Sequence, residues 1–377
     1  MGQEERSVTE RHSRRKWLRD ASAAAGYTIL APAIAGAATM GIPGPFPGRV
    51  VAVAHSGVIS GATVQSAAVR QIFQMGLLRL TEARSVNDAW AQFVSPADVV
   101  GIKINSSNGP APLSSPQVFN EVVQELYAAG VPLSNIVIFD RYQYYFDSLQ
   151  MGSWIPAGVS LAFASYICDR LQQDINGYDP DYYVDLPYVP LGQGLENDTA
   201  RRSYIAQFAT KRVTKIINLA VLKDHNAAGV TLALKNISYG LANNVNRGHE
   251  VVTNPHYDVF IPAIVSSTPI RAKVVLNIVD GIRGTYTGGP GSPSSGMWDN
   301  KTMYFATDPV AVDRVCWKAI DAKRASVGFP PADTPGPGED PQLVRQPSYI
   351  LSAGAAGLGE SDDTRIDLRR YQYGLMR

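Results

Sequence analysis

The chain is poor in cysteine, with only Cys168 and Cys316 among its 377 residues. Two cysteines cannot form the disulfide scaffold of a small secreted protein. Nor can they supply the four thiolates of an ordinary iron–sulfur cluster, so we expect no such cluster. The cofactor is otherwise unknown, with a divalent metal as one candidate. If the chain is exported, a single disulfide between the two cysteines is an open alternative.

The chain also lacks an excess of charge of either sign. Its 34 basic and 33 acidic residues leave a formal net charge of +1, and no basic patch is interleaved with aromatic residues. We therefore expect no nucleic-acid partner. Repeats of fixed period are absent as well. With 45% hydrophobic and 18% charged residues, the composition is that of a globular protein, and the length indicates two domains or one large α/β domain with insertions.

Several well-known catalytic and nucleotide-binding motifs are missing. No G-x-G-x-x-G follows the first apolar run, and the sequence contains no G-x-S-x-G and no H-E-x-x-H. The glycine-rich loop TGGPGSPSSG lacks the Lys-Ser/Thr ending of a phosphate-binding loop. A standard dinucleotide site, a serine-hydrolase elbow and a helical zinc motif are therefore unsupported.

Residues 1–40 are predicted to be an export signal rather than part of the fold. The paired Arg14 and Arg15 precede an uncharged, alanine-rich run that ends in an A-x-A-like site. This order is typical of the twin-arginine signal. We therefore expect the twin-arginine export machinery as a partner and a periplasmic or extracellular location. The run could also be an uncleaved anchor, but Gly26 and Pro32 disfavour a stable membrane span.

The remaining pattern predicts an α/β fold with a mostly parallel mixed sheet and helices on both faces. Strands that are almost continuously apolar, separated by helices, are typical of such a sheet. The helix signals are clearest in SSPQVFNEVVQELYAAG, with Pro116 in its first turn and Gly130 at its end. Residues 61–80 also have helical spacing. The expected strands are RVVAVAHS, DVVGIKIN, NIVIFD, KIINLAVL, KVVLNIVD and TMYFATD.

The α/β domain is predicted to span residues 50–327, after a linker at 41–49. Residues 141–210 interrupt its pattern and are rich in Tyr, Asp and Pro, so we expect an inserted irregular subdomain or lid. Residues 328–377 begin as a Pro/Gly-rich connection and end in a short helix or strand.

Polar side chains follow every strong strand candidate. Ligands of an open parallel sheet bind beyond the carboxyl ends of its strands, so these polar ends predict one shared cleft. The residues are Lys103 and Asn105; Asp140 and Arg141; Lys223, Asp224 and His225; Asp280; and Asp308 with Asp313 one helical turn later. Lys235 and Asn236 follow on a predicted helix, and they face the same cleft only if that helix runs back over the sheet.

Each type of side chain has a chemical use in such a cleft. Lysines are compact cations suited to phosphate or carboxylate, and a histidine can exchange protons near neutral pH. The predicted catalytic residues are therefore His225, Lys223 and Asp280, and the predicted substrate-binding residues are Lys103, Asn105, Lys235 and Asn236. Asp308 and Asp313 are candidate ligands of a hard divalent metal.

Some of these residues also have structural explanations. Asp308 suits a helix N-cap and Asp224 could cap the helix that follows it. His249 and His256 lie in a loop-like stretch, where exposed histidines are the usual outcome. The helix that begins near Ser115 offers free backbone N–H groups, which are a further potential anion site.

Four motifs occur in a fixed order, namely VGIKIN, LKDHNAAGVTLALKNISYG, VVLNIVDGIRG with its later GGPGSP, and FATDPVAVDRV. Together they resemble the family called domain of unknown function 362, over roughly residues 50–325. The family pattern falls on Lys103 and Asn105; Lys223 and His225; Lys235, Asn236 and Gly240; Asp280; Gly289 and Pro290; and Asp308 and Asp313.

The resemblance implies no particular activity. Some members of the family carry ferredoxin-like cysteine clusters, but the two separated cysteines of this chain provide no such module. We therefore carry two hypotheses. One is an exported enzyme, an isomerase, lyase or oxidoreductase, that acts on an anionic small molecule. The other is a non-catalytic periplasmic ligand-binding protein or an accessory protein of a redox complex.

Overall fold

The computed structural model describes residues 41–106, 115–167, 172–249, 255–291 and 294–374. The predicted export signal and Cys168 lie outside these residues, so the structure does not bear on either. Cys316 is buried and has no disulfide partner among the described residues. Within the described ranges, no helix is long and apolar enough to cross a membrane.

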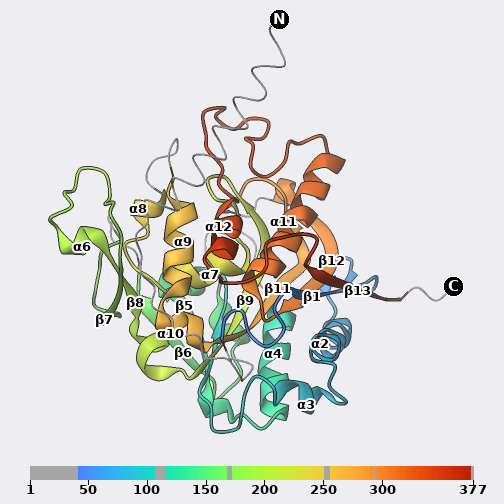
Figure 1. The fold of residues 1–377 in the computed structure, drawn as a ribbon. Coiled ribbons are helices and arrows are strands. Elements are labelled where there is room, and N and C mark those ends of the chain that lie inside the picture. Colours follow the sequence, from blue (N-terminus) through green and yellow to red (C-terminus); the bar gives the residue numbers. More distant parts are fainter. Residues whose placement is uncertain (1–40, 107–114, 168–171, 250–254, 292–293, 375–377) are drawn as a thin grey trace, which may run out of the picture. The chain divides into compact units, whose positions relative to one another are not determined.

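A nine-stranded mixed sheet forms the centre of the fold (Figure 1). Its strands, in spatial order, are β13 (Asp367–Tyr373), β1 (Arg49–His55), β12 (Met297–Ala306), β11 (Val274–Thr285), β9 (Lys215–His225), β4 (Val100–Lys103), β5 (Ile136–Tyr142) and β6 (Ser160–Ser165), with the short β10 (Gly229–Val230) paired to β9. Strand β12 is antiparallel to both of its neighbours, β10 is antiparallel to β9, and the other pairs are parallel. The predicted mostly parallel α/β fold is confirmed.

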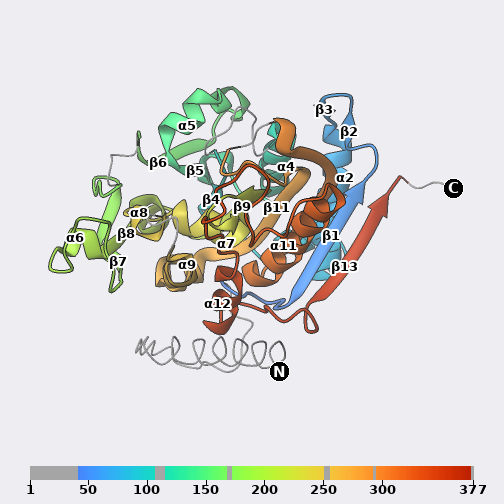
Figure 2. The ribbon, with the colours of Figure 1, turned by 90° about the horizontal axis from the view of Figure 1, so that it is seen from above.

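Helices cover both faces of the sheet (Figures 1 and 2). One face carries α2 (Ser66–Thr81), α3 (Val86–Trp90) and α4 (Pro116–Ala128), and the other carries α7 (Leu232–Tyr239), α9 (Tyr257–Ser266), α11 (Pro309–Ser326) and α12 (Tyr349–Ala355). The short helices are α5 (Gln143–Ser148), α6 (Asp198–Arg201), α8 (Asn246–His249) and α10 (Thr268–Lys273). Each face packs its own apolar cluster, which is why the central strands are apolar at almost every position.

Local signals define the starts of two helices correctly. Ser115 caps α4 through a 3.2 Å hydrogen bond that its Oγ accepts from the N–H of Val118, and Pro116 occupies the first helical position. Asp308 caps α11 in the same way, accepting from the N–H groups of Val310 and Ala311. These contacts depend on a few neighbouring residues, so sequence alone suffices to predict them.

Residues 141–210 are more regular than expected. They hold the two-stranded sheet of β7 (Tyr178–Asp185) and β8 (Arg202–Ala206), which stands apart from the main sheet. They also contribute β6 to the main sheet, in parallel register with β5. Strand β6 pairs with one neighbour only and is partly exposed, so it lacks the continuous apolar run that identified the central strands.

The C-terminal segment is part of the same sheet. Residues 328–348 contain no helix or strand, as predicted, and α12 follows. Strand β13 then pairs in parallel with β1 along its whole length. The segment therefore completes one side of the fold rather than forming an appendage to it.

Candidate functional site

A polar cavity lies beyond the carboxyl ends of β4, β5 and β9. Its volume is about 170 Å³, and we call it the site cavity. The residues of its wall that matter below are Lys103, Asn105, Asp140, Arg141, His225, Thr231, Lys235, Asn236, Tyr239 and His249. Five of the nine predicted site residues therefore meet in one place.

Helix α7 brings Lys235 and Asn236 to this cavity. After β9 the chain forms a tight antiparallel pairing between β9 and β10, and α7 begins at once at Leu232. Lys235 and Asn236 thus lie in the first turns of the helix, where it packs against β9. The sequence placed Lys235 and Asn236 in the cleft only if their helix runs back over the sheet, and α7 does so.

Lys103 is buried and paired. Its ammonium donates to Asp140 Oδ1 at 2.7 Å, to Asn236 Oδ1 at 3.2 Å and to the carbonyl of Ile104. Burial lowers the pKa of Lys103, whereas the negative charge of Asp140 acts against that shift. Gly240 packs on this lysine so closely that a Cβ there would lie 2.0 Å from Lys103 Cε, which explains the glycine.

Asn236 belongs to a chain of buried amides that crosses the sheet. Its Oδ1 accepts from Lys103 and Asn105, and its Nδ2 donates to Asn218 Oδ1 at 2.8 Å. Asn218 donates in turn to Asn277 Oδ1 at 2.8 Å. Asn236 therefore holds Lys103 in place, and both ends of its amide already have protein partners.

His225 presents a defined tautomer to the cavity. Its Nδ1 accepts hydrogen bonds from the N–H groups of Ala227 at 3.1 Å and Ala228 at 3.2 Å. A nitrogen that accepts carries no proton, so the proton of the neutral ring is on Nε2. Burial lowers the pKa of His225 well below its usual range, and the charges of Lys235, His249 and Lys223 act in the same direction. The neutral ring thus presents the Nε2–H as a hydrogen-bond donor, and the acid/base role expected from the sequence stays a prediction.

Lys235 is buried without an acidic partner among the described residues. Its ammonium lies 4.0 Å from the centre of the Tyr239 ring, one helical turn on. Burial lowers the pKa of Lys235 well below its usual range, and the positive charges of Lys223 and Arg141 lower it further. The attraction of a cation to a ring face is worth about 0.5–2 kcal/mol. Removing an ammonium from water costs several kcal/mol, so the ring contact offsets only part of the cost of burying the charge, in line with the lowered pKa.

Lys223 and Asp224 hold a neighbouring loop. Lys223 donates to the carbonyl of Pro290 at 2.9 Å, and Asp224 Oδ1 accepts from the N–H of Gly289 at 2.9 Å. A Cβ on Gly289 would lie 2.0 Å from the carbonyl oxygen of Asp224, so the close approach requires glycine. Burial lowers the pKa of Lys223 to about 8. Asp224 does not cap a helix; its second oxygen accepts from Arg345, a residue that the sequence did not single out.

The sequence expectation of an exposed His249 is wrong. This ring lines the site cavity, with its centre 5.9 Å from that of His225 and 4.5 Å from that of Tyr239. Burial lowers its pKa well below the usual range. His256 is half-buried and packs on Tyr188 at 4.4 Å. Helix α8 supplies His249 from a loop-rich stretch, for which hydrophobic periodicity carries no signal.

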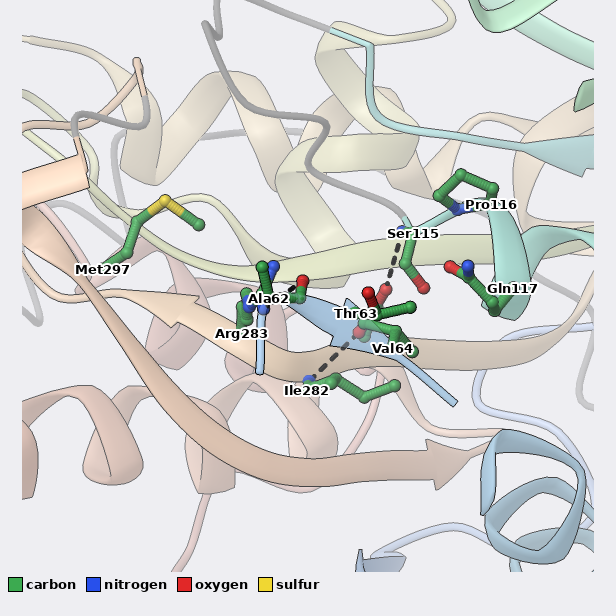
Figure 3. Close-up of a pocket in the computed structure, with 10 residues that line it drawn as sticks. Ala62, Thr63, Val64, Ser115, Pro116, Gln117, Ile282, Arg283 and Met297 are labelled. Atoms are coloured by element: carbon green, nitrogen blue, oxygen red, sulfur yellow. Dashed lines mark hydrogen bonds between the residues drawn. The ribbon is translucent and has the colours of Figure 1, made fainter. Parts of the chain in front are cut away.

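Asp280 lies in a different cavity, of about 300 Å³. Its oxygens accept from the N–H of Ser115 at 3.2 Å and of Ile282 at 3.1 Å, drawn as dashed lines in Figure 3. The carboxylate thus occupies the start of α4, where the sequence predicted an anion site. Burial raises the pKa of Asp280 to about 6. Met297 and Arg283 also line this second cavity, apart from His225 and Lys235.

Asp308 and Asp313 line neither cavity. Strand β12 runs antiparallel to β11. Its carboxyl end, and Asp308 after it, therefore lie level with the amino end of β11, away from the site cavity. Asp308 caps α11, and Asp313 accepts from the N–H groups of Ala233 at 2.7 Å and Leu234 at 2.9 Å. Among the described residues, no group of three or more metal-binding side chains forms. The predicted metal role would require breaking these caps.

The site cavity is electropositive. Among the residues of the cavity wall, Asp140 is the one with an acidic side chain. Its oxygens accept hydrogen bonds from the ammonium of Lys103 and the N–H of Ser106. Arg141 adds a cation, held by the carbonyls of Tyr239 at 3.0 Å and Ala242 at 3.4 Å. The hydroxyl of Thr231 is buried with no hydrogen-bond partner in the described structure. Such a group favours a polar ligand, since buried polar atoms are normally paired.

A family model described as Domain of unknown function (DUF362) matches residues 100–318, more than half of the chain, so the protein belongs to that family. No curated protein is significantly similar to the chain.

Two solved structures are weakly similar to the chain. The lactate racemase apoprotein from Thermoanaerobacterium thermosaccharolyticum is 11% identical, with a TM-score of 0.39 over 66% of this chain and 54% of that chain. A protein from Thermotoga maritima is 10% identical, with a TM-score of 0.35 over 59% of this chain and 51% of that chain. The chain thus spans about half the length of each, and these values concern the fold alone.

Proposed function

We propose that this protein is an enzyme that acts on a small anionic molecule in the site cavity. The observation that carries the proposal is the meeting of Lys235, His225 and His249 with two cations, Lys103 and Arg141, in the wall of one cavity. Ionisable side chains with strongly shifted pKa values cluster at catalytic sites, although structural ion pairs shift them too. Here His225, His249 and Lys235 have no acidic partner in the described structure that would explain their burial.

The division of roles follows from charge. The cationic side chains of Arg141 and Lys103 in the cavity wall attract the anion. The Nε2–H of His225 donates to an oxygen of the substrate, where it stabilises developing negative charge. A volume near 170 Å³ suits a molecule about the size of benzene, which fills a cavity of about 150 Å³. The substrate class is therefore a compact carboxylate of roughly six non-hydrogen atoms.

Binding is tested by calorimetry with glyoxylate, pyruvate, lactate and inorganic phosphate at constant ionic strength. We expect at least one of these anions to bind, and the Arg141→Gln variant to bind it about tenfold more weakly or worse, since hydrogen bonds to charged groups contribute about 1.5–3 kcal/mol. The matched control is Arg314→Gln, which removes an arginine that pairs with Asp363 at the surface. Circular dichroism verifies the fold of each variant. Failure of every anion to bind contradicts the proposal.

Catalysis is tested on whichever acid binds. Incubation in deuterated water, followed by proton NMR, reports carbon–hydrogen exchange or a new product, and the His225→Ala variant should lose this activity while it keeps its fold. Binding without exchange or product would instead support the non-catalytic ligand-binding protein.

We also propose that the protein is exported by the twin-arginine route. The support is the Arg14-Arg15 pair ahead of an uncharged, alanine-rich run that ends in an A-x-A-like site. Replacing both arginines by lysine should leave the protein in the cytoplasm, as fractionation of cells expressing the full chain would show. Unchanged export would contradict the proposal.

A further inference from the structure

Lys235 combines features that a substrate-binding lysine does not need. It is only 7% exposed, it lines the site cavity, and no carboxylate pairs with it among the described residues. Its Nζ lies over the rings of Tyr239 and Tyr257, 4.0 Å and 5.9 Å from their centres. Lys103, which sits on the same wall, has three oxygen partners and stays in the role of a paired cation.

The two lysines therefore differ in their chemistry. A lysine amine without a proton is a nucleophile, and burial beside other cations is a known way to produce one. Lys235 has both conditions, since it is enclosed by the cavity wall and has Lys223 and Arg141 as charged neighbours. Lys103 instead has a carboxylate partner, Asp140, at 2.7 Å, whose negative charge opposes the lowering of its pKa.

We propose that the amine of Lys235 forms an imine with the aldehyde or ketone group of a small oxo acid bound in the site cavity. This inference rests on the proposed function, because the carboxylate must be held by the cationic wall. The amine nitrogen bonds to the carbonyl carbon as the carbon–oxygen π bond breaks. The oxygen then leaves as water, together with the two hydrogens of the amine, so atoms balance and no redox partner is needed.

The surroundings suit each step. The Nε2–H of His225 can donate to the carbonyl oxygen as it gains negative charge, and the rings of Tyr239 and Tyr257 form the apolar wall beside the amine. Once protonated, an imine withdraws electrons from the neighbouring carbon. It would thereby ease loss of a proton from that carbon, or of carbon dioxide where that carbon carries the carboxylate, as in a 3-oxo acid; this fits an isomerase or a lyase.

The test is reductive trapping of the full chain. Purified protein is incubated with glyoxylate or pyruvate and cyanoborohydride, and peptide mass spectrometry locates the reduced adduct. We expect one stoichiometric adduct on Lys235, and its complete loss in Lys235→Met. Lys211→Met is the matched control, because Lys211 is an exposed lysine that pairs with Asp179 at 3.5 Å. This control should be labelled like the unmodified protein.

The outcomes separate the two proposals. If neither acid gives an adduct on Lys235, or if labelling is spread over surface lysines alone, the imine proposal is wrong. Calorimetry on the same samples then shows whether the anion still binds, in which case the proposed function survives. Lactate, which has the carboxylate but no carbonyl group, should reduce labelling by pyruvate if both occupy the site cavity.

Discussion

Asp224 and Arg345 form a fully buried ion pair, with Oδ2 and Nη2 3.1 Å apart, although 121 residues separate them in the chain. Asp224 lies between Lys223 and His225 at the end of β9, whereas Arg345 comes from the irregular segment after α11. Arg345 also binds Glu339 at 2.8 Å. The pair thus fastens the C-terminal segment behind the wall of the site cavity.

Replacing Arg345 by Met should lower the free energy of unfolding by about 3–5 kcal/mol, because it leaves Asp224 charged and buried without its partner. Adding Asp224→Asn should recover part of the loss, since the amide carries no charge. Urea unfolding of the native protein, the two single variants and the double variant measures the coupling energy between Asp224 and Arg345. Arg365→Met is the control: its side chain is 69% exposed and pairs with Glu360, so at most about 1 kcal/mol should be lost.

Replacing Lys235 by Met should stabilise the protein near neutral pH. The folded-state pKa of Lys235 is lowered from 10.5, so between the two values the unfolded chain binds a proton that the folded chain does not. The free energy of unfolding of the native protein then rises with pH, with a slope that approaches about 1.4 kcal/mol per pH unit. The variant should lack this slope in urea unfolding at pH 7 and pH 9, whereas Lys318→Met, a surface variant, should keep it.

His225 should be neutral and protonated at Nε2. The reason is that its Nδ1 accepts two backbone N–H groups, which also opposes the imidazolium form. Nitrogen NMR of protein labelled in its five histidines can read the tautomer directly, with His225→Gln to assign the signal. Burial lowers the pKa of this ring, so its signals should not move as pH falls to 6.5. An imidazolium at pH 6.5 would contradict the donor role.

Replacing Asp280 by Asn should have its most favourable effect on the stability of the protein at neutral pH. The folded pKa is about 6 against 3.8 in the unfolded chain, so the carboxyl group stabilises the fold at low pH and that contribution is lost as pH rises through 6. About two pKa units correspond to about 3 kcal/mol. The stability of the variant relative to the native protein should therefore rise by about that amount between pH 4 and pH 8. The exposed Asp147→Asn variant should show no such trend.

Replacing Asp313 by Ala should lower the free energy of unfolding by about 0.5–2 kcal/mol, the usual effect of losing a helix cap, because two N–H groups at the start of α7 lose their acceptor.

If Asp308 and Asp313 only cap helices, a chelator should leave the melting temperature of the native protein unchanged. A drop in melting temperature on chelation that the Asp308→Asn variant lacks would instead restore the predicted metal role.

The sequence alone predicted that the polar residues at the strand ends lie close together, because the carboxyl ends of parallel strands lie on the same side of a sheet. Lys103, His225 and Lys235 meet in the site cavity for that reason. Asp308 does not, because β12 is antiparallel, and an apolar run looks the same in either direction. The direction of a strand is decided by which neighbours it pairs with, so no local pattern could reveal it.

The amino-acid sequence was sufficient for the α/β class, the caps of α4 and α11, and the order of the family motifs, because each depends on hydrophobic period or on residues a few positions apart. Tertiary structure alone decided which ionisable groups of the site are paired. Among the described residues, the amine of Lys235 has no carboxylate partner and that of Lys103 has one, although both follow strong apolar signals. Long-range packing also brought His249 and Arg345 to the site region, since the path of a loop follows from the surfaces it packs on.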